Sequence, residues 1–353
     1  MFLSIQQPQI PSNVKIVQVC SWNQTMLLSS DGKLYVGGYG SNGRLSITTN
    51  INNHNNHNNI NYPVPLSFFK SKFVKKIWCL DHYFALTSKN ELYGWGLNDF
   101  SQLGLNSTCY ISTPQLISIP NETILKVAAG SIYSLFLCKS QKVYGCGSNN
   151  HFQLSLPGKH KRNIPTEIPF LSDKNIIQVV AGHIHSLFLS NDFKIWGTGN
   201  NSYGQLGLSS TKHQEKCVLL KIQEKIIKIK SRRHMSFFLS ISGNVYACGY
   251  NGNGSMGILN YNNKITVPTL IQSKFKFQDI SCGWRHCLFL TTRGEVYASG
   301  INDKGQLGTN VEEKTNKLVK VKIKNLSSLK LSKYLNKMRS KKKLIDCIIK
   351  TLK

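Results

Sequence analysis

Short apolar runs alternate with turn residues along most of the chain, and this pattern predicts β-strands rather than helices. The run His185–Ser190, HSLFLS, is typical, and a second apolar run follows it after a short turn. The turns are clearest at Asp31-Gly32, Ser242-Gly243 and Arg293-Gly294, which are hairpin signals. Because no stretch of this pattern carries a long helical stripe, we expect an all-β fold.

One block of this pattern recurs six times at intervals of roughly 50 residues. The repeat cores span residues 19–46, 77–104, 127–155, 179–207, 229–257 and 280–308. Each core contains two strands, and stretches such as IPTEIPF and VPTLI lie between cores and supply another. About four short antiparallel strands per repeat make a β-propeller blade, because stacked blades bury faces that one blade leaves exposed.

Three positions keep their residue type from copy to copy. An aromatic residue stands at Tyr35, Tyr93, Tyr144, Trp196, Tyr246 and Tyr297, and a glycine follows at Gly38, Gly96, Gly147, Gly199, Gly249 and Gly300. Two residues after that glycine, five copies have Asn and the first has Gly40. Since Gly and Asn tolerate positive φ, we expect tight turns here.

The full pattern is a strand pair followed by aromatic-x-x-Gly-x-Asn-x-x-Gly-Gln-Leu-Gly, and it resembles the RCC1 (regulator of chromosome condensation) repeat. The final tetrapeptide is GQLG at 204–207 and 305–308 and SQLG at 101–104, with degenerate versions in the other copies. The resemblance covers roughly residues 10–325 and implies a β-propeller, usually of seven blades. Six clear repeats leave a six- or a seven-bladed ring open, and we expect Leu318–Ile323 to close it against the N-terminal segment.

The sequence predicts two regions, a propeller over residues 1–325 and a tail over 326–353. An Asn-rich loop at 50–61 accounts for the longer first spacing. In the tail, apolar residues follow helical steps, which indicates a basic amphipathic helix. Those residues are Leu331, Leu335, Met338, Ile345, Ile349 and Leu352. Three interpretations of the tail stay open: a docked helix, a nuclear-import or anion-binding patch, and a membrane-surface or calmodulin-type target.

The chain has a formal net charge of +28, which favours acidic or polyanionic partners. The candidate contacts for such partners are Arg339, Lys341, Lys342, Lys343, Lys337, Lys333, Arg232 and Arg233. Trp22, Trp284 and Arg285 are candidate contacts on the propeller surface. The segment 283–286, GWRH, resembles part of a pentapeptide of the plant UV-B photoreceptor branch, but two tryptophans on separate blades do not make its chromophore cluster.

We find no constellation for catalysis, a cofactor or a metal, and expect none. Two Gly-x-Gly-x-x-Gly matches, at 38–43 and 252–257, fall inside the repeated turns with no helix after them, so neither fits a dinucleotide site. His82, His185 and His286 stand at strand starts, where we expect packing or hydrogen bonding. Cys146 and Cys248 fill the place of Trp95 and are expected to be buried.

The sequence therefore predicts a non-catalytic protein-interaction scaffold that binds a protein partner through propeller loops. Two alternatives stay open: a regulator or guanine-nucleotide exchange factor of a Ran- or Rab-type small GTPase, which the resemblance implies, and chromatin or nucleic-acid binding, which the charge favours. The ten cysteines form no Cys-x-x-Cys pair, and no leader or membrane span is evident. We expect reduced thiols, a monomer, and a cytoplasmic or nuclear location.

Overall fold

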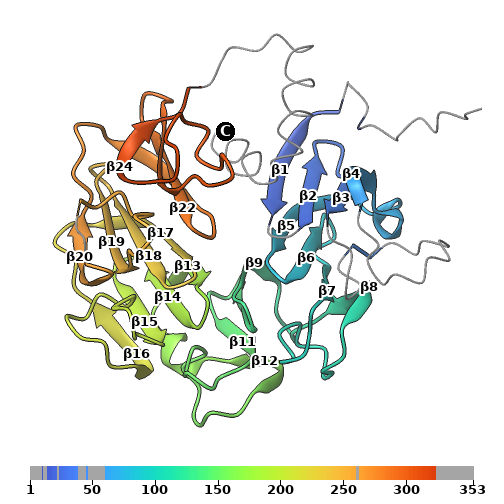
Figure 1. Ribbon diagram of the computed structural model, residues 1–353. Coiled ribbons are helices and arrows are strands. Elements are labelled where there is room, and N and C mark those ends of the chain that lie inside the picture. Colours follow the sequence, from blue (N-terminus) through green and yellow to red (C-terminus); the bar gives the residue numbers. More distant parts are fainter. Residues whose placement is uncertain are drawn as a thin grey trace, which may run out of the picture. The chain divides into compact units, whose positions relative to one another are not determined.

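The computed structural model describes residues 10, 14–21, 24–38, 45–46, 60–259 and 262–322. These residues form six four-stranded antiparallel sheets, each with its strands in sequence order (Figure 1). One sheet corresponds to each repeat, so the expectation of about four strands per repeat is confirmed. Apart from short 3-10 turns at Ser67–Phe69 (η2) and Pro169–Leu171 (η3), the described elements are all strands.

Two compact units divide the chain, and each holds three sheets. Unit 1 comprises Met1–Asn149 and His160–Ile168. Sheet 1 contains β1 (Ile16–Ser21), β2 (Gln24–Ser29), β3 (Leu34–Gly38) and β4 (Ile60–Pro65). Sheet 2 contains β5 (Val74–Cys79), β6 (His82–Thr87), β7 (Leu92–Gly96) and β8 (Ile111–Ile117). Sheet 3 contains β9 (Ile124–Ala129), β10 (Tyr133–Cys138), β11 (Val143–Gly147) and β12 (Arg162–Glu167).

Unit 2 comprises Asn150–Lys159 and Pro169–Lys353. Sheet 4 contains β13 (Ile176–Ala181), β14 (His185–Ser190), β15 (Ile195–Gly199) and β16 (Gln214–Leu220). Sheet 5 contains β17 (Ile226–Arg232), β18 (Met235–Ser240), β19 (Val245–Tyr250) and β20 (Lys264–Leu270). Sheet 6 contains β21 (Phe277–Cys282), β22 (His286–Thr291), β23 (Val296–Ile301) and β24 (Lys314–Lys320).

The second strand of each sheet carries most of the core. Every residue of β6, β10, β14, β18 and β22 is buried, because neighbouring strands flank it within the sheet and side chains cover both faces. Phe84, Phe136, Phe188, Phe238 and Phe289 of these strands are fully buried. This explains why the runs are continuously apolar instead of alternating.

Side-chain amides also join neighbouring sheets within each unit. The Gln18 amide of β1 donates to the Ile77 carbonyl of β5 at 2.6 Å and accepts from its N–H at 3.1 Å. Gln178 of β13 makes the same pair of bonds with Ile229 of β17, at 2.8 and 3.0 Å. The partly buried first strands are thus linked by satisfied polar groups as well as by apolar packing.

The tight turns predicted at the recurring glycines and asparagines are present, but only the glycines have positive φ. Gly249 has a φ of +111° and Gly300 a φ of +116°, whereas the five asparagines have no positive φ. The side chains of Asn98, Asn201, Asn251 and Asn302 hold their turns: Asn201 Oδ1 accepts from the Leu206 N–H at 2.8 Å, and its Nδ2 donates to the Ser210 carbonyl at 2.8 Å. Positive φ falls on the tetrapeptide itself, at positions such as Gly204 and Gly207.

One strand and one pair of cysteines add to the sequence-based picture. Leu318 lies in β24, which pairs with β23 and completes sheet 6, whereas most of the N-terminal segment expected beside it lies outside the described residues. Cys20 of β1 and Cys79 of β5 form a disulfide with a Cα–Cα distance of 5.8 Å, so the expectation of reduced thiols is wrong for this pair. The predicted tail helix over 326–353 lies outside the described residues.

Candidate functional site: an aromatic and basic cluster on unit 2

Aromatic and basic side chains gather where the strands of unit 2 turn. The β13–β14 turn carries His183, the β17–β18 turn carries Arg233 and His234, and the β21–β22 turn carries Trp284 and Arg285. In a four-stranded meander, the connection after the third strand lies at the same end of the strands as the turn after the first strand. Tyr203, Tyr250 and Lys264 therefore join them, and we call these eight residues the aromatic–basic cluster.

The tightest contact of the cluster joins sheets 5 and 6. The guanidinium carbon of Arg233 lies 4.0 Å from the centre of the Trp284 ring. Trp284 keeps 40% of its surface exposed, so the stack fixes the indole while leaving part of it open to solvent. A guanidinium placed over an indole is a favourable cation–π contact, and it orders both side chains before a partner arrives.

A chain of rings continues from this stack across sheets 4 and 5. The ring centres of His183 and His234 are 5.2 Å apart, and those of His234 and Tyr203 are 4.8 Å apart. Tyr203 also contacts Tyr250 at 5.1 Å, and the Lys264 ammonium lies 5.5 Å from the Tyr203 ring centre. These spacings are those of interacting aromatic pairs, so the rings form one connected surface.

The cluster carries positive charge with little acidic compensation. Burial, followed by repulsion from Arg285, lowers the pKa of Arg233. Burial is also the main reason that the pKa of His234 falls to about 4, with His183 and Arg233 adding to it, so this imidazole is neutral at pH 7. Within the described ranges, no carboxylate forms an ion pair with Arg233, Arg285 or Lys264.

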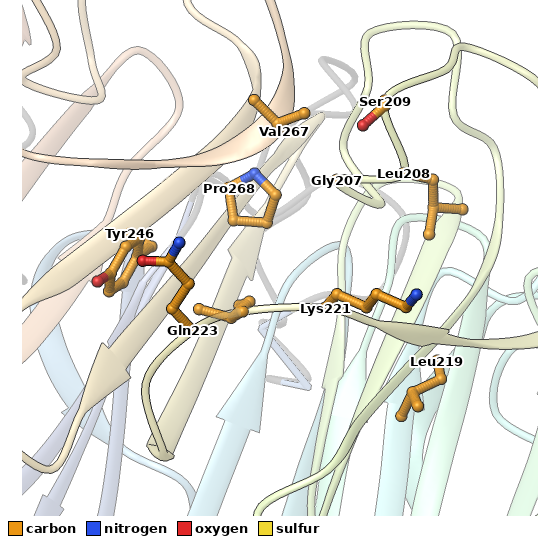
Figure 2. A pocket seen from close by; sticks show the side chains of 10 residues that line it. Gly207, Leu208, Ser209, Leu219, Lys221, Gln223, Tyr246, Val267 and Pro268 are labelled. Atoms are coloured by element: carbon orange, nitrogen blue, oxygen red, sulfur yellow. The ribbon is translucent and has the colours of Figure 1, made fainter.

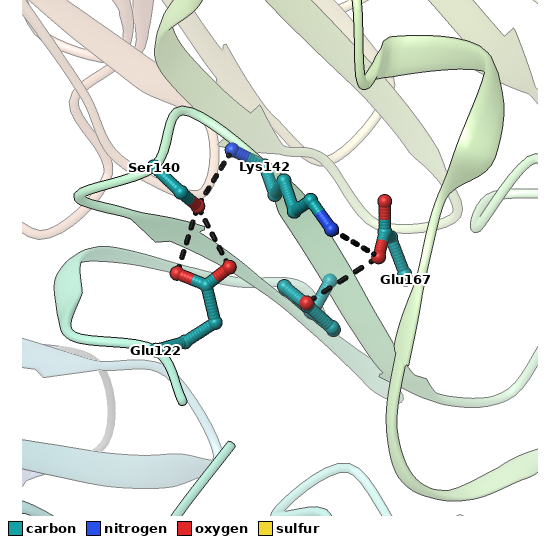
Figure 3. A network of polar contacts seen from close by, with 5 residues as sticks. Glu122, Ser140, Lys142 and Glu167 are labelled. Atoms are coloured by element: carbon teal, nitrogen blue, oxygen red, sulfur yellow. Dashed lines mark hydrogen bonds and ion pairs between the residues drawn. The ribbon is translucent and has the colours of Figure 1, made fainter. Parts of the chain in front are cut away.

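Many carboxylates instead form hydrogen bonds or ion pairs near the hairpin turns and linkers, at the opposite end of the strands. Figure 3 shows two in sheet 3: Glu122 accepts from the Ser140 hydroxyl, and Glu167 pairs with Lys142 at 3.1 Å. In unit 2, Glu224 accepts from the Tyr246 hydroxyl at 2.7 Å. Hydrogen bonds from Ser242, Tyr246 and Asn244 lower the pKa of Glu224 to about 2, which keeps it ionised where it is bound.

The structure brings together three of the sequence-predicted contacts. Arg233, Trp284 and Arg285 meet in the cluster, and Arg232, the last residue of β17, pairs with Met235 in the ladder. Trp22 and the tail residues Lys333, Lys337, Arg339, Lys341, Lys342 and Lys343 lie outside the described residues. The sequence analysis missed the other five cluster residues as contacts, although His183 shares the repeat register of Arg233 and Trp284: these five are His183, Tyr203, His234, Tyr250 and Lys264.

Four of the side chains considered for chemistry are buried and uncharged at neutral pH. His82 and His185 are fully buried, and burial lowers the pKa of each to about 3. Burial also raises the pKa of the Cys146 and Cys248 thiols far above neutral pH, as expected for packing residues. No group of three or more His, Cys, Asp or Glu residues in the described part of the chain is arranged to hold a metal.

Family profiles identify the repeats. The profile of the Regulator of chromosome condensation (RCC1) repeat matches residues 89–137, 141–189 and 242–290. A second profile of the same repeat matches residues 176–205 and 277–306. The chain belongs to the RCC1 repeat family. Its six sheets are therefore the blades of a β-propeller, and the sequence-based expectation of this family and fold is confirmed.

Curated relatives share this repeat region but differ in what surrounds it. The ultraviolet-B receptor UVR8 of Arabidopsis thaliana is 29% identical over 304 residues, covering 83% of this chain and 67% of the receptor. The human E3 ubiquitin-protein ligase HERC2 is 28% identical over 316 residues, which cover 84% of this chain but 6% of the ligase. The RCC1-type chain thus matches only a small part of the ligase.

Solved structures agree on the fold. Yeast RCC1 superposes with a TM-score of 0.77 at 20% identity, covering 87% of this chain and 75% of that one. Human WBSCR16 gives a TM-score of 0.76 at 23% identity, covering 88% and 82%. Among the residues that the structure describes, we find no helix that is long and apolar enough to span a membrane.

Proposed function

We propose that this RCC1-type propeller is a non-catalytic scaffold that binds an acidic surface of a partner protein through the aromatic–basic cluster. The Arg233–Trp284 stack carries this proposal, because Trp, Tyr and Arg are the residues that most often dominate the energy of protein interfaces. The stack is already ordered, partly exposed and surrounded by uncompensated positive charge. Such a surface meets an acidic patch without first rearranging.

The test compares the proteins captured by full-length wild type and by two variants, Arg233→Gln and Trp284→Ala. We expect both variants to lose the same acidic partners, because they remove the charge and the ring of one stack. Lys212→Glu changes the charge of an exposed residue in the β15–β16 loop outside the cluster and serves as the control. Partner sets that are identical for the wild type and both cluster variants would contradict the proposal.

Regulation of a small GTPase is the second candidate, and a relative favours it. Yeast RCC1 has been solved together with a study of its binding to Gsp1p and histones. Accelerated release of labelled GDP from a Ran- or Rab-type GTPase by this chain would support the candidate. Unchanged release across both types would end it. For either role we propose a location in the cytoplasm or the nucleus.

A further inference from the structure

A groove opens in unit 2 beside the outer strands of sheets 4 and 5, away from the aromatic–basic cluster. Its volume is about 540 Å³. Leu219 of β16 and Val267 of β20 line it while remaining 41% and 44% exposed, and Tyr246 and Pro268 also face it. Lys221, in the linker between the sheets, extends across it (Figure 2). The groove thus combines apolar walls with one exposed cation.

Three of the other sheets show one way in which this position is covered, whereas the linker before sheet 3, residues 118–123, has no aromatic residue to place on Tyr144. Tyr246 occupies the repeated aromatic position, and three equivalents receive a ring from the linker before their sheet. Phe69 contacts Tyr93 at 5.7 Å, Phe170 contacts Trp196 at 5.2 Å, and Phe275 contacts Tyr297 at 4.6 Å between ring centres.

The linker before sheet 5 supplies no ring. It brings Ile222 and Gln223 to the groove, and no described aromatic side chain forms a ring contact with Tyr246. Figure 2 shows Gln223 beside Tyr246. The Tyr246 hydroxyl donates to Glu224 at 2.7 Å, which holds the ring in a fixed orientation. The site therefore has the aromatic residue of sheets 2, 4 and 6 without the linker ring that contacts it there.

We propose that this groove docks an extended peptide of a partner protein that inserts an aromatic side chain against Tyr246 and places carboxylates near Lys221. The inserted ring does for sheet 5 what Phe170 and Phe275 do for sheets 4 and 6. The exposed Lys221 forms no ion pair with a described residue. Lys216 and Lys225 on the adjoining strand and linker stand next to Glu215 and Glu224, so Lys221 is the cation that a peptide carboxylate would meet. An acidic peptide fits this charge.

The probes are two fluorescein-labelled pentapeptides, Asp-Asp-Phe-Asp-Asp and Asp-Asp-Ala-Asp-Asp, titrated against the full-length chain by fluorescence polarisation. We expect the Phe peptide to bind at least roughly tenfold more tightly, because burying an aromatic ring is worth more than burying a methyl group. Gln223→Phe supplies the missing ring from the chain itself, so it should weaken binding at least about tenfold without lowering the thermal midpoint.

Two further variants keep the result interpretable. Val267→Asp changes an exposed lining residue and Lys221→Glu reverses the cation, and each should also weaken the Phe peptide by about tenfold or more. Lys212→Glu makes the same charge change outside the groove and should leave binding within about twofold.

Equal binding of the two peptides, or unchanged binding to Gln223→Phe, would overturn the proposal. So would failure of the Phe peptide to bind the wild type. Trp284→Ala separates this site from the proposed scaffold function, because it removes the cluster stack and leaves the groove intact. Weaker peptide binding in the groove variants alone identifies the groove as a second, independent site.

Discussion

His82 Nε2 and the Ser134 hydroxyl lie 2.7 Å apart and join the second strands of sheets 2 and 3. His185 and Ser236 repeat the contact between sheets 4 and 5 at 3.0 Å. Ser134 in turn donates to the Gln102 carbonyl at 2.7 Å, and Ser236 donates to the Gln205 carbonyl at 2.6 Å. The histidine of one repeat and the Gln of the tetrapeptide therefore meet at the same serine of the next repeat.

These histidines predict a loss of stability in acid. Their pKa is about 3 in the folded protein and 6.5 in the unfolded chain, so the unfolded chain binds more protons between pH 3 and pH 6.5. Their contribution is intact above pH 6.5 and falls as pH drops toward 3, by up to about 1.4 kcal/mol per pH unit for each histidine. Urea unfolding at pH 7.5, 6.0 and 5.0 measures this slope.

His82→Gln removes one titrating group and should make the slope shallower. Glutamine is compatible with the position because Gln24 occupies it in the first repeat. The exposed His160→Gln is the control and should keep the wild-type slope. A slope that does not differ between the two variants would show that His82 does not contribute to the acid sensitivity.

Loss of one turn asparagine should destabilise the protein measurably. Asn98 is fully buried, accepts from the Leu103 N–H at 2.9 Å and donates to the Ser107 carbonyl at 2.8 Å. Asn98→Ala leaves both backbone groups without these partners, so we expect a loss of about 1–3 kcal/mol in the free energy of unfolding. The exposed Asn191→Ala should cost less than about 0.5 kcal/mol in the same urea titration.

Two glycines with positive φ should differ in their tolerance of a side chain. A Cβ on Gly249 would lie 2.0 Å from the His234 carbonyl oxygen, whereas a Cβ on Gly294 would meet nothing within 4 Å. Gly294→Ala should cost about 1–2 kcal/mol from backbone strain alone, and Gly249→Ala more than about 3 kcal/mol. Equal thermal shifts for the two variants would contradict the close approach of Gly249 to His234.

Removal of Arg233 should expose Trp284. We expect Arg233→Ala to increase acrylamide quenching of tryptophan emission and shift it to the red, because the guanidinium covers one face of the indole. The spectrum of Arg233→Ala/Trp284→Phe, subtracted from that of Arg233→Ala, isolates the signal of Trp284. Arg233→Lys keeps the charge but not the planar stack, so it should resemble Arg233→Ala.

The salt dependence of DNA binding tests whether the basic tail contacts phosphates. We expect replacement of Lys341, Lys342 and Lys343 by Gln in the full-length chain to weaken binding to duplex DNA. The log–log slope of affinity against salt should become shallower by about 0.9 for each phosphate that the variant no longer neutralises. Arg232→Gln, on the propeller, is the comparison. An unchanged slope for the triple variant would show that these lysines do not bind phosphates.

The sequence by itself determined the blades, because each repeat contains its own strand pattern, turn glycine and tetrapeptide. Local periodicity reports such features directly. The buried second strands, the fixed aromatic position and the burial of Cys146 and Cys248 were all predictable in this way. The cause of the asparagine turns was misassigned because Asn both tolerates positive φ and forms side-chain hydrogen bonds, and periodicity does not separate these roles.

Only the tertiary structure decided which residues of different repeats meet. Arg233 and Trp284 share a repeat register but lie 51 positions apart in the chain, and their stack depends on how sheets 5 and 6 pack. The groove at Tyr246 likewise depends on a ring that the linker does not supply. Disulfide pairing of Cys20 with Cys79 has the same origin. Contacts between sheets are long-range, so the local pattern of each repeat specifies its blade but not the surface that neighbouring blades build together.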